Sequence, residues 1–469
     1  MDQPAISHQL AAFVSTTRSA DVPDAVKAHA SRAVLDWVGS ALAGSLEEPA
    51  RLAREVVGRL GSSNDSTVFA GRRAAAAGAA FANGVATHIL ELDDVHKGST
   101  LHAAAPVIPA ALAVAEREHA SGEAFLLAVT LGYEVAFRIG EAVNPSHYTF
   151  WHPTGTVATF GAAVAAGSLL RLDANQMLHA LGSAGTQAAG LWEFNVDGAM
   201  SKALHPGKAG MNGILAADLA RAGFTGASRI LEGPRGFMRA TTASHDASRV
   251  TDALGERWTI AENCYKMHSC CGHTHSAIDV AQEVRRAYGW REEHDVLRAV
   301  ASVEVETYAP GLAIVGNDRP TSAYQAKFSL AYCVAAALLE GRVGLVQFSD
   351  DRFDGRGVRQ ASIATLLPRI RVRATDELTA RYPAAWGTRL TVLLTGGERV
   401  VREADYPLGN PENPVSTDAL VAKLRELVTP RWGSDVAARA VATVDALPEQ
   451  GDMADAFAEL VPEHVPVHA

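Results

Sequence analysis

Cysteine is scarce in this chain. Only four of its 469 residues are cysteines, namely Cys264, Cys270, Cys271 and Cys333. So few cysteines in so long a chain exclude a small secreted fold held together by disulfide bonds. We therefore expect the thiols to be reduced.

Blocks of positive charge are also missing. No run of five or more basic residues occurs, and the formal net charge is -10 at pH 7. This composition argues against nucleic acid and anionic membranes as partners. It leaves an anionic small molecule open, because a local cationic pocket can exist inside an acidic protein.

Long hydrophobic runs and a targeting pattern are absent as well. No stretch of about 18 apolar residues free of charge occurs, as a membrane-spanning helix would require. The first residues, Met1–Ser7, lack the positive-then-apolar pattern of a signal peptide. We expect a cytoplasmic protein.

Apolar helical sequence is what the chain has in abundance. Apolar residues make up 48% of the chain and charged residues 20%, which is ordinary for a soluble globular protein. The length predicts two or three domains. Helical spacing of apolar residues predicts helices over Asp24–Ala43, Arg73–Leu92, Pro109–His119, Gly122–Ile139, Gly155–Leu170 and Ala174–Gly190.

Near residue 295 the pattern changes to that of strands. Val300–Tyr308 alternates apolar and polar residues, as a half-buried strand does. Thr388–Thr395 and Glu398–Arg402, separated by two glycines, predict a hairpin. Helical sequence returns at about Ser416. We predict a mainly α protein with a large helical domain built from both chain ends (1–268 and 404–469) and an inserted, smaller α+β lid domain (269–403).

The most informative segment is Glu91–Pro106. Between two long apolar segments it places Asp93, Asp94, His96, Lys97 and His102. Carboxylates beside imidazoles in a loop held by rigid helices are what proton-transfer chemistry requires. The alternative is a solvated helix end with N-capping aspartates, and the segment alone does not decide between the two.

Further polar clusters interrupt other apolar stretches. Some lie at the start of a helix, where free backbone N–H groups can bind an anion. The clusters are Asn144–Thr156 with His147, Tyr148 and His152; Ser201–Lys208 with Lys202, His205 and Lys208; Leu231–Phe237 with Arg235; and Lys266–His275. For any one histidine taken alone, a surface or capping role is the simpler interpretation.

The segment Lys266–His275 also suggests a metal site or a nucleophilic cysteine. However, Cys270 and Cys271 are adjacent rather than spaced as Cys-x-x-Cys, and no second ligand pair is placed to complete a tetrahedron. A nucleophilic cysteine needs an activating base, which the sequence does not identify. Both stay open as alternatives.

The coincidence of these clusters is more informative than any single member. Separate helix ends can bring their cations, imidazoles and carboxylates to one cavity. Lysine, arginine and helix N-termini suit a substrate with several carboxylates. Aspartate and histidine suit removal of a proton from the carbon beside one of them. The pattern favours an enzyme that acts on a small polycarboxylate.

These motifs, taken in order, resemble the MmgE/PrpD family over nearly the whole chain, up to about residue 400. The segments that carry the resemblance are Leu92–His96, His102–Ala111, Gly132–Val135, His152–Thr156, Lys202–Ala209, Leu231–Phe237, Lys266–His275 and Ala326–Leu330. The family includes 2-methylcitrate dehydratase, cis-aconitate decarboxylase and iminodisuccinate epimerase.

The resemblance implies a homodimeric enzyme with no metal and no organic cofactor, acting on a substrate with two or three carboxylates. It implies catalytic roles for Asp93, His102, His152, Lys202 and Tyr148. Substrate contacts are expected from Lys266, Arg235, His275, Cys271 and His96.

Two departures from the family pattern bear on the reaction. Cys271 stands where decarboxylase members have a histidine, five residues after the lysine that matches Lys266. A tyrosine of those members is also missing, since residues 315–317 are Val-Gly-Asn. Both departures argue against cis-aconitate decarboxylation. Tyr148 resembles an acid/base tyrosine of epimerase-type members.

We therefore expect a cofactor-independent hydro-lyase of the 2-methylcitrate dehydratase type. In this hypothesis Lys202 or the Asp93–His102 pair removes the proton, and His152 or Tyr148 protonates the leaving hydroxyl. The alternative is an epimerase in which Lys202 and Tyr148 oppose one another. A non-catalytic role on the same scaffold is a third hypothesis.

Overall fold

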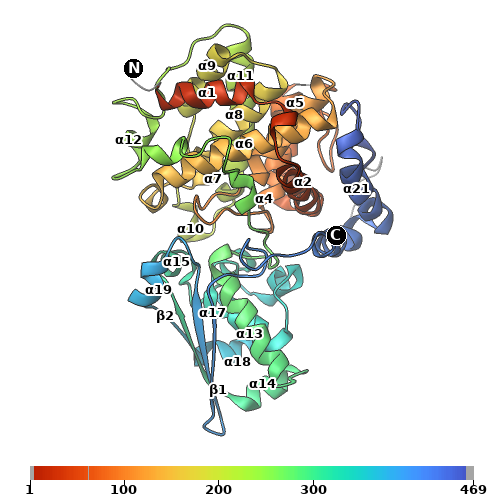
Figure 1. Cartoon of the computed structure of the whole chain (residues 1–469). Coiled ribbons are helices and arrows are strands. Elements are labelled where there is room, and N and C mark those ends of the chain that lie inside the picture. Colours follow the sequence, from red (N-terminus) through yellow and green to blue (C-terminus); the bar gives the residue numbers. More distant parts are fainter. Residues whose placement is uncertain (1–4, 62, 461–469) are drawn as a thin grey trace.

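The computed structural model describes residues 5–61 and 63–460 (Figure 1). The chain is mainly α-helical, as predicted, with one four-stranded sheet among the described residues. The helices before residue 242 are α1 (Ile6–Thr16), α2 (Asp24–Gly44), α3 (Glu48–Leu60), α4 (Ala76–His88), α5 (Ala104–Arg117), α6 (Gly122–Val143), α7 (Pro153–Thr156), α8 (Ala158–Leu169), α9 (Ala174–Gly185), α10 (Phe194–Asp197), α11 (Ser201–Arg221) and α12 (Phe237–Thr241).

The remaining elements include the sheet and the C-terminal helices. They are α13 (His275–Ala287), α14 (Glu293–Ala299), β1 (Val300–Thr307), α15 (Ala309–Val315), α16 (Ala323–Ala326), α17 (Leu330–Glu340), α18 (Ala361–Leu366), β2 (Ile370–Ala374), α19 (Asp376–Arg381), β3 (Thr388–Leu394), β4 (Arg399–Ala404), α20 (Thr417–Trp432) and α21 (Ser434–Ala446). None of the described helices is long and apolar enough to cross a lipid bilayer.

The main hydrophobic core combines both ends of the chain. Buried residues between Leu10 and Tyr265 form one cluster with residues between Val415 and Leu460. Polar contacts support this packing, because Lys423 forms a 2.6 Å ion pair with Asp36 of α2. The C-terminal helices therefore pack beside α2 in the larger, upper part of the molecule in Figure 1.

A second hydrophobic core lies between Cys270 and Val400. Its sheet has the order β2-β1-β3-β4, with β1 parallel to β2 and antiparallel to β3. Helices α13 and α17 pack with it in the lower part of the molecule in Figure 1. The α+β composition of this segment agrees with the sequence, whereas its exact bounds and its role as a lid stay predictions.

Individual elements follow the sequence pattern with a few differences. The predicted hairpin is confirmed as β3 and β4, with Gly397 in the turn at φ 87°. Helix α5 begins at Ala104 rather than at Pro109, and Pro109 lies inside it. Helix α9 ends at Gly185 instead of Gly190, whose φ of 150° is not helical. The predicted start at Pro109 and the predicted end at Gly190 were therefore wrong, because proline and glycine alone do not locate the ends of a helix.

Two helices that carry site residues approach each other unusually closely. A Cβ atom added at Gly84 of α4 would lie 2.8 Å from the Cα of Gly207 in α11. Only glycine at both positions allows this approach without displacing the backbone. The contact fixes the end of α4, which carries His88, relative to the start of α11, which carries Lys202.

Candidate active site

The loop between α4 and α5 is fixed by Asp94. The Asp94 carboxylate accepts hydrogen bonds from the backbone N–H of Ala104 at 3.0 Å and from the hydroxyl of Tyr133 at 2.7 Å. Burial raises the pKa of Asp94 to about 7. Asp94 therefore anchors the loop on α5 and α6, and its neighbour Asp93 is free to serve a different contact.

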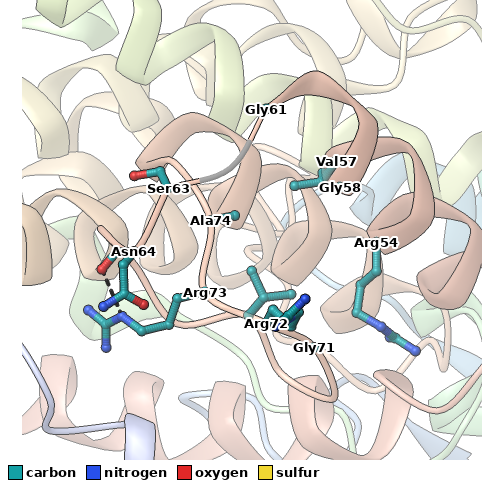
Figure 2. A pocket seen from close by; sticks show the side chains of 11 residues that line it. Arg54, Val57, Gly58, Gly61, Ser63, Asn64, Gly71, Arg72, Arg73 and Ala74 are labelled. Atoms are coloured by element: carbon teal, nitrogen blue, oxygen red, sulfur yellow. Dashed lines mark hydrogen bonds between the residues drawn. The ribbon is translucent and has the colours of Figure 1, made fainter.

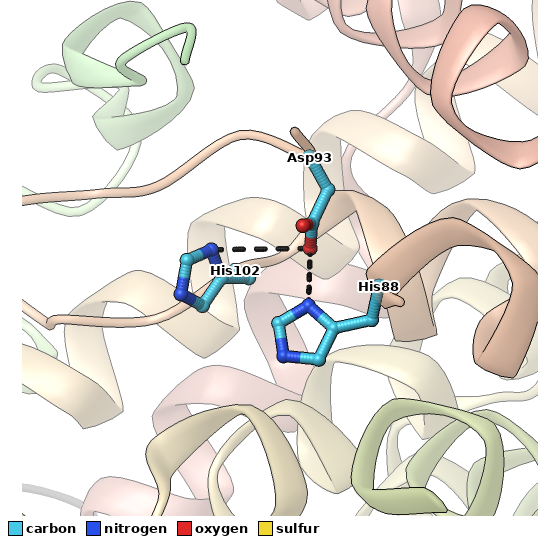
Figure 3. Close-up of side chains that lie close together, drawn as sticks. All are labelled: His88, Asp93 and His102. Atoms are coloured by element: carbon cyan, nitrogen blue, oxygen red, sulfur yellow. Dashed lines mark hydrogen bonds and ion pairs between the residues drawn. The ribbon is translucent and has the colours of Figure 1, made fainter. Parts of the chain in front are cut away.

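Asp93 lies between two imidazoles (Figure 3). Its Oδ2 accepts a hydrogen bond from His88 Nδ1 at 2.7 Å and lies 3.8 Å from His102 Nδ1. Burial alone would raise the pKa of Asp93, but His88 and His102 lower it below the usual range. Asp93 is therefore a buried anion held by histidines.

His102 is held in one tautomer. Its Nδ1–H donates to the backbone carbonyl of Asp94 at 2.5 Å, so Nε2 carries the lone pair. Among the described residues, no hydrogen bond to Nε2 is present. Burial lowers the pKa of His102 well below its ordinary value, so the ring is neutral near pH 7. A neutral imidazole with a free Nε2 and a nearby carboxylate can accept a proton.

Glu91 lies between two lysines. It forms ion pairs with Lys202 and, at 3.4 Å, with Lys266, and all three side chains are buried. Burial alone would raise the pKa of Glu91, but Lys202 and Lys266 lower it well below the usual range. Glu91 also raises the pKa of Lys266, against the lowering effect of burial. Two ammonium groups thus share one carboxylate.

The backbone at Glu91 is unusual. Its φ of 58° lies in the left-handed region, which is strained for a residue other than glycine and is often found at functional sites. The carbonyl of the preceding Leu90 accepts hydrogen bonds from Ser269 Oγ and Lys327 Nζ, both at 2.8 Å. Residues from beyond the main core thus help to hold the turn that presents Glu91.

His152 continues the cluster from the start of α7. Its Nδ1 lies 3.0 Å from His205 Nδ1, and its ring stacks on that of His88 at 5.5 Å between centroids. Burial and the neighbouring His205 lower the pKa of His152 well below its ordinary value. Lys208 supports this region by donating to the Gly155 and Ala189 carbonyls.

Tyr148 faces His273 of the segment Lys266–His275. Its hydroxyl lies 3.4 Å from His273 Nε2, and the Nδ1 of His273 contacts the Tyr308 hydroxyl at 2.6 Å. Burial raises the pKa of Tyr148 well above its ordinary value and raises that of Cys271 to about 11. Both groups therefore keep their protons at neutral pH, which makes Cys271 an unactivated thiol and not a thiolate nucleophile.

The structure brings together most of the predicted residues. Asp93, His102 and His152 are linked through His88, while Lys202 and Lys266 meet at Glu91. Electrostatic interactions connect the two groups, because Lys266 acts on Asp93 and Lys202 on His152. Tyr148 and Cys271 border them.

Three predicted substrate-binding residues form no hydrogen bond or ion pair with this cluster among the described residues, although burial and, electrostatically, Lys266 lower the pKa of His275. His96 stacks on Phe137 at 4.2 Å and faces Glu141 and Glu262. His275 contacts the Cys270 carbonyl and the ring of His268. Arg235 is exposed just before α12, and within the described chain it makes no hydrogen bond or ion pair to the cluster. Their predicted contacts with substrate stay predictions.

Sequence analysis missed several members of the cluster as site residues: His88, Glu91, His205 and His273 were not assigned. His88 ends an Ala-rich helix that looked like plain core. Glu91 lies in the segment Glu91–Pro106 that was singled out, two positions before Asp93. Its acidic side chain so close to Asp93 was the signal that could have identified it. His205 and His273 lie in the polar clusters Ser201–Lys208 and Lys266–His275, but nothing in the sequence distinguishes them from surface or capping residues.

Two groups of side chains could be considered as metal ligands. The ligand atoms of His88, Asp93 and His102 lie within 4.8 Å of one another. However, the Nδ1 atoms of both histidines carry protons that they donate, to Asp93 and to the Asp94 carbonyl, and a metal would have to displace these protons. The hydrogen bonds explain this geometry without an ion.

The second group is His96, Glu141 and Glu262. Arg257 donates to Glu141 at 2.7 and 2.9 Å and to Glu262 at 2.6 and 2.8 Å. All four carboxylate oxygens therefore already accept hydrogen bonds from one guanidinium, which occupies the positions that a metal ion would need.

A large cavity of about 700 Å³ lies elsewhere, beside α3 (Figure 2). Arg54, Arg72 and Arg73 line it from separate positions. Arg73 donates to the Ala454 carbonyl and pairs with Asp455, so it anchors the C-terminal segment. The convergent histidines, lysines and carboxylates are at the α4–α5 loop and not in this cavity.

The fold and the site together define a helical protein with a buried centre of lysines, imidazoles and carboxylates. Comparison with known proteins identifies the family. Residues 8–250 match the MmgE/PrpD N-terminal domain, and residues 268–449 match the MmgE/PrpD C-terminal domain. The chain belongs to the MmgE/PrpD family.

Similar curated proteins span nearly the whole chain. "Cis-aconitate decarboxylase-like protein oryM" of Aspergillus oryzae is 27% identical over 97% of this chain and 96% of its own. The cis-aconitate decarboxylases of Aspergillus terreus and Homo sapiens are 26% and 27% identical over 90% of this chain, covering 89% and 87% of their own lengths.

Proposed function

We propose that the protein is a cofactor-independent lyase that removes a proton beside a carboxylate of a small di- or tricarboxylic acid. Its family and its relatives indicate a lyase-type enzyme. The observation that carries the finer proposal is the Asp93–His102 pair in the same buried cluster as the two ammonium groups of Lys202 and Lys266.

His102 is the proposed base. Its neutral Nε2 would take the proton from carbon, and the Asp93 carboxylate 3.8 Å from Nδ1 would stabilise the imidazolium that forms. The sequence left Lys202 as an alternative base. Its ion pair with Glu91 presents it as a cation instead, which suits binding of a carboxylate.

Lys202 and Lys266 are the proposed carboxylate clamp. As the carbon loses its proton, negative charge moves onto the adjacent carboxylate, and two buried ammonium groups would stabilise it there. In a dehydration, Tyr148 would protonate the hydroxyl on the neighbouring carbon, which leaves as water while the double bond forms. His152, the other acid that the sequence suggested, is less suited to this role because burial and His205 lower its pKa. Tyr148 keeps its proton at neutral pH and so can donate it.

Dehydration is the reaction we propose first, and decarboxylation is a second candidate. The relatives named cis-aconitate decarboxylase favour the second. Against it, Cys271 and residues 315–317 differ from the pattern of decarboxylase members. Decarboxylation would break a carbon–carbon bond, release carbon dioxide and leave a carbanion for Tyr148 to protonate.

Incubation of the purified protein with 2-methylcitrate, citrate, cis-aconitate and iminodisuccinate in deuterated water tests these alternatives. Dehydration yields a conjugated alkene with new ultraviolet absorbance, and decarboxylation releases carbon dioxide. Deuterium in recovered substrate without either product indicates epimerisation. Absence of turnover and of exchange with every di- and tricarboxylate tested would contradict the proposal.

A further inference from the structure

Helix α20 carries a lysine in its buried face. Leu420, Leu424 and Leu427 recur at helical spacing and are buried, and Lys423 lies among them with only 7% of its side chain exposed. A buried ammonium group is unfavourable unless it is paired and hydrogen-bonded. The packing of α20 therefore gives no reason for a lysine at this position, and its polar contacts must supply one.

Lys423 has two acceptors on different parts of the molecule. Its Nζ donates to Asp36 Oδ1 of α2 at 2.6 Å and to the Leu92 carbonyl at 2.7 Å. The two helices approach closely here, since a Cβ atom added at Gly39 of α2 would lie 3.2 Å from a Cα atom of α20. One ammonium group thus joins α2, α20 and the loop between α4 and α5.

The Leu92 carbonyl is the backbone group that leads into Asp93. It belongs to the peptide group that joins the two residues, and a peptide group is planar. Within the described residues, Lys423 is the one hydrogen-bond donor to this carbonyl. Holding the carbonyl therefore fixes the plane from which the Asp93 side chain starts, and with it the 2.7 Å approach of Asp93 to His88.

Asp36 links the same lysine to the charge of the site. Asp36 is buried, and its Oδ2 has no hydrogen-bond partner among the described residues. Asp36 and Asp93 repel each other electrostatically, so neutralisation of Asp36 by Lys423 also favours the anionic form of Asp93. Lys423 thus acts on Asp93 through a hydrogen bond and through a charge, and substitutions can separate the two.

We infer that Lys423 is a positioning residue of the active site, which orients Asp93 through the Leu92 carbonyl without touching the substrate. The inference rests on the proposed function, because the orientation of Asp93 affects turnover only if the Asp93–His102 pair removes the proton.

The first test measures kcat and KM of full-length variants with whichever of 2-methylcitrate, citrate, cis-aconitate and iminodisuccinate is turned over fastest. Lys423→Met should lower kcat by about 10²-fold, as a misplacement of about 1 Å can. KM should change little, because Asp93 does not bind the carboxylates. Wild-type kcat in Lys423→Met would overturn the inference.

A double variant separates positioning from the cost of an unpaired buried charge. Lys423→Met combined with Asp36→Asn removes both partners of the buried ion pair, which a fold tolerates better than loss of one, but the Leu92 carbonyl still lacks its donor. Its kcat should stay as low as in Lys423→Met, and recovery to the wild-type value would overturn the inference. Arg431→Met is the matched control. It removes another cation of α20, which contacts Ala43 and Glu47 instead of the loop, and should keep the wild-type kcat.

Chemical rescue is a readout that a merely structural role would not move. A cavity of about 430 Å³ is lined by Lys423 and Leu92 and by the exposed Arg342 and Glu426, so it reaches the surface. Propylammonium added to Lys423→Ala can therefore reach the place of the missing ammonium group and should raise kcat several-fold, whereas propanol should not. Equal gains from the two compounds, or no gain from either, would overturn the inference.

Failure of the proposed function gives a different result. If none of the four polycarboxylates is turned over, the proton resonance of the His88 Nδ1–H decides, because this proton lies in the hydrogen bond to Asp93. The resonance, assigned by its absence in His88→Asn, should shift or disappear in Lys423→Met and stay in place in Arg431→Met. An unchanged resonance in Lys423→Met would overturn the positioning role independently of any activity.

Discussion

At the scale of single residues, Glu91 balances the positive charges of Lys202 and Lys266. It is the only carboxylate shown to pair with both Lys202 and Lys266 within the described chain. Without it, two ammonium groups would be buried close together, and their repulsion would favour loss of a proton from one of them. A residue that was not assigned from the sequence therefore controls the charge of the proposed carboxylate clamp.

Glu91→Gln should lower kcat/KM by about 10²-fold or more, the order expected when a buried charge-stabilising group is removed. Because Glu91 raises the pKa of Lys266, its loss should also move the alkaline limb of the pH–rate profile to lower pH. Glu91→Asp should restore part of both effects. Glu116→Gln is the matched control, since it neutralises another buried glutamate, at the far end of α5. An unchanged alkaline limb in Glu91→Gln would contradict the role given to Glu91.

The proposed base predicts the acid side of the profile. Burial lowers the pKa of His102 well below 6.5, and Asp93 acts in the opposite direction by raising it. Activity that needs neutral His102 should therefore persist below pH 6.5. Asp93→Asn should lower kcat by about 10²-fold or more and move the acid limb to still lower pH. A shift of the limb to higher pH would show that another group is titrating.

At the scale of elements, the close contact of α4 and α11 positions the site. Gly84→Ala would place a Cβ 2.8 Å from the Gly207 Cα and 3.0 Å from the Ala105 carbonyl oxygen. We expect a loss of about 1–3 kcal/mol in the free energy of unfolding from this overpacking, measured by urea denaturation. Activity should fall as well, because His88 and Lys202 would separate.

Gly58→Ala is the matched control for this change. It lies within α3, where an added Cβ has no neighbour within 4 Å. Replacing a helical glycine by alanine in open space should stabilise the protein by about 0.5–1 kcal/mol. Equal effects of the two substitutions would mean that the α4–α11 contact is not tight.

Elements were predictable from the sequence where a periodic pattern had a clear end. Helix α2 follows the predicted Asp24–Ala43 within one residue, and the hairpin follows its two glycines. The start of α5 was not predictable in the same way. Pro106 lies in its first turn, where no intrahelical N–H donor is needed. Pro109 lies one turn further on, and because proline is common at the start of a helix, the sequence pattern placed the start of the helix there.

The site was predictable in its residue types more than in its contacts. Asp93, His102, Lys202 and Lys266 were identified from motifs and from the family resemblance. Their partner Glu91 was not, because it pairs with lysines 111 and 175 positions away in the chain. Such pairing depends on how helices pack, which single-sequence periodicity does not contain.

At the scale of the whole molecule, Lys327 ties the second part of the chain to the main helical core. It is buried just before α17, donates to the Leu90 carbonyl, and has its pKa lowered to about 8 by burial. A lysine that binds its proton less tightly when folded than when unfolded costs stability at neutral pH, and this cost disappears as the pH rises from about 8 to 10.5.

The free energy of unfolding of the wild type, relative to Lys327→Met, should therefore increase by about 2 kcal/mol between pH 7.5 and 9.5. Denaturant titrations of both proteins at each pH measure this difference. Lys27→Met is a control, because the Lys27 side chain is 38% exposed and its one ion pair among the described residues is with the exposed Asp24. A difference that stays constant across this range would mean that Lys327 is not desolvated in solution.

The hydrogen bonds to the Leu90 carbonyl have a mechanical consequence. Ser269 and Lys327 reach this carbonyl from the part of the chain that builds the second core, and the next residue is the shared counter-ion of the lysine pair. Loss of these two contacts would therefore weaken the join between the two cores and, through the same turn, the charge balance of the lysine pair.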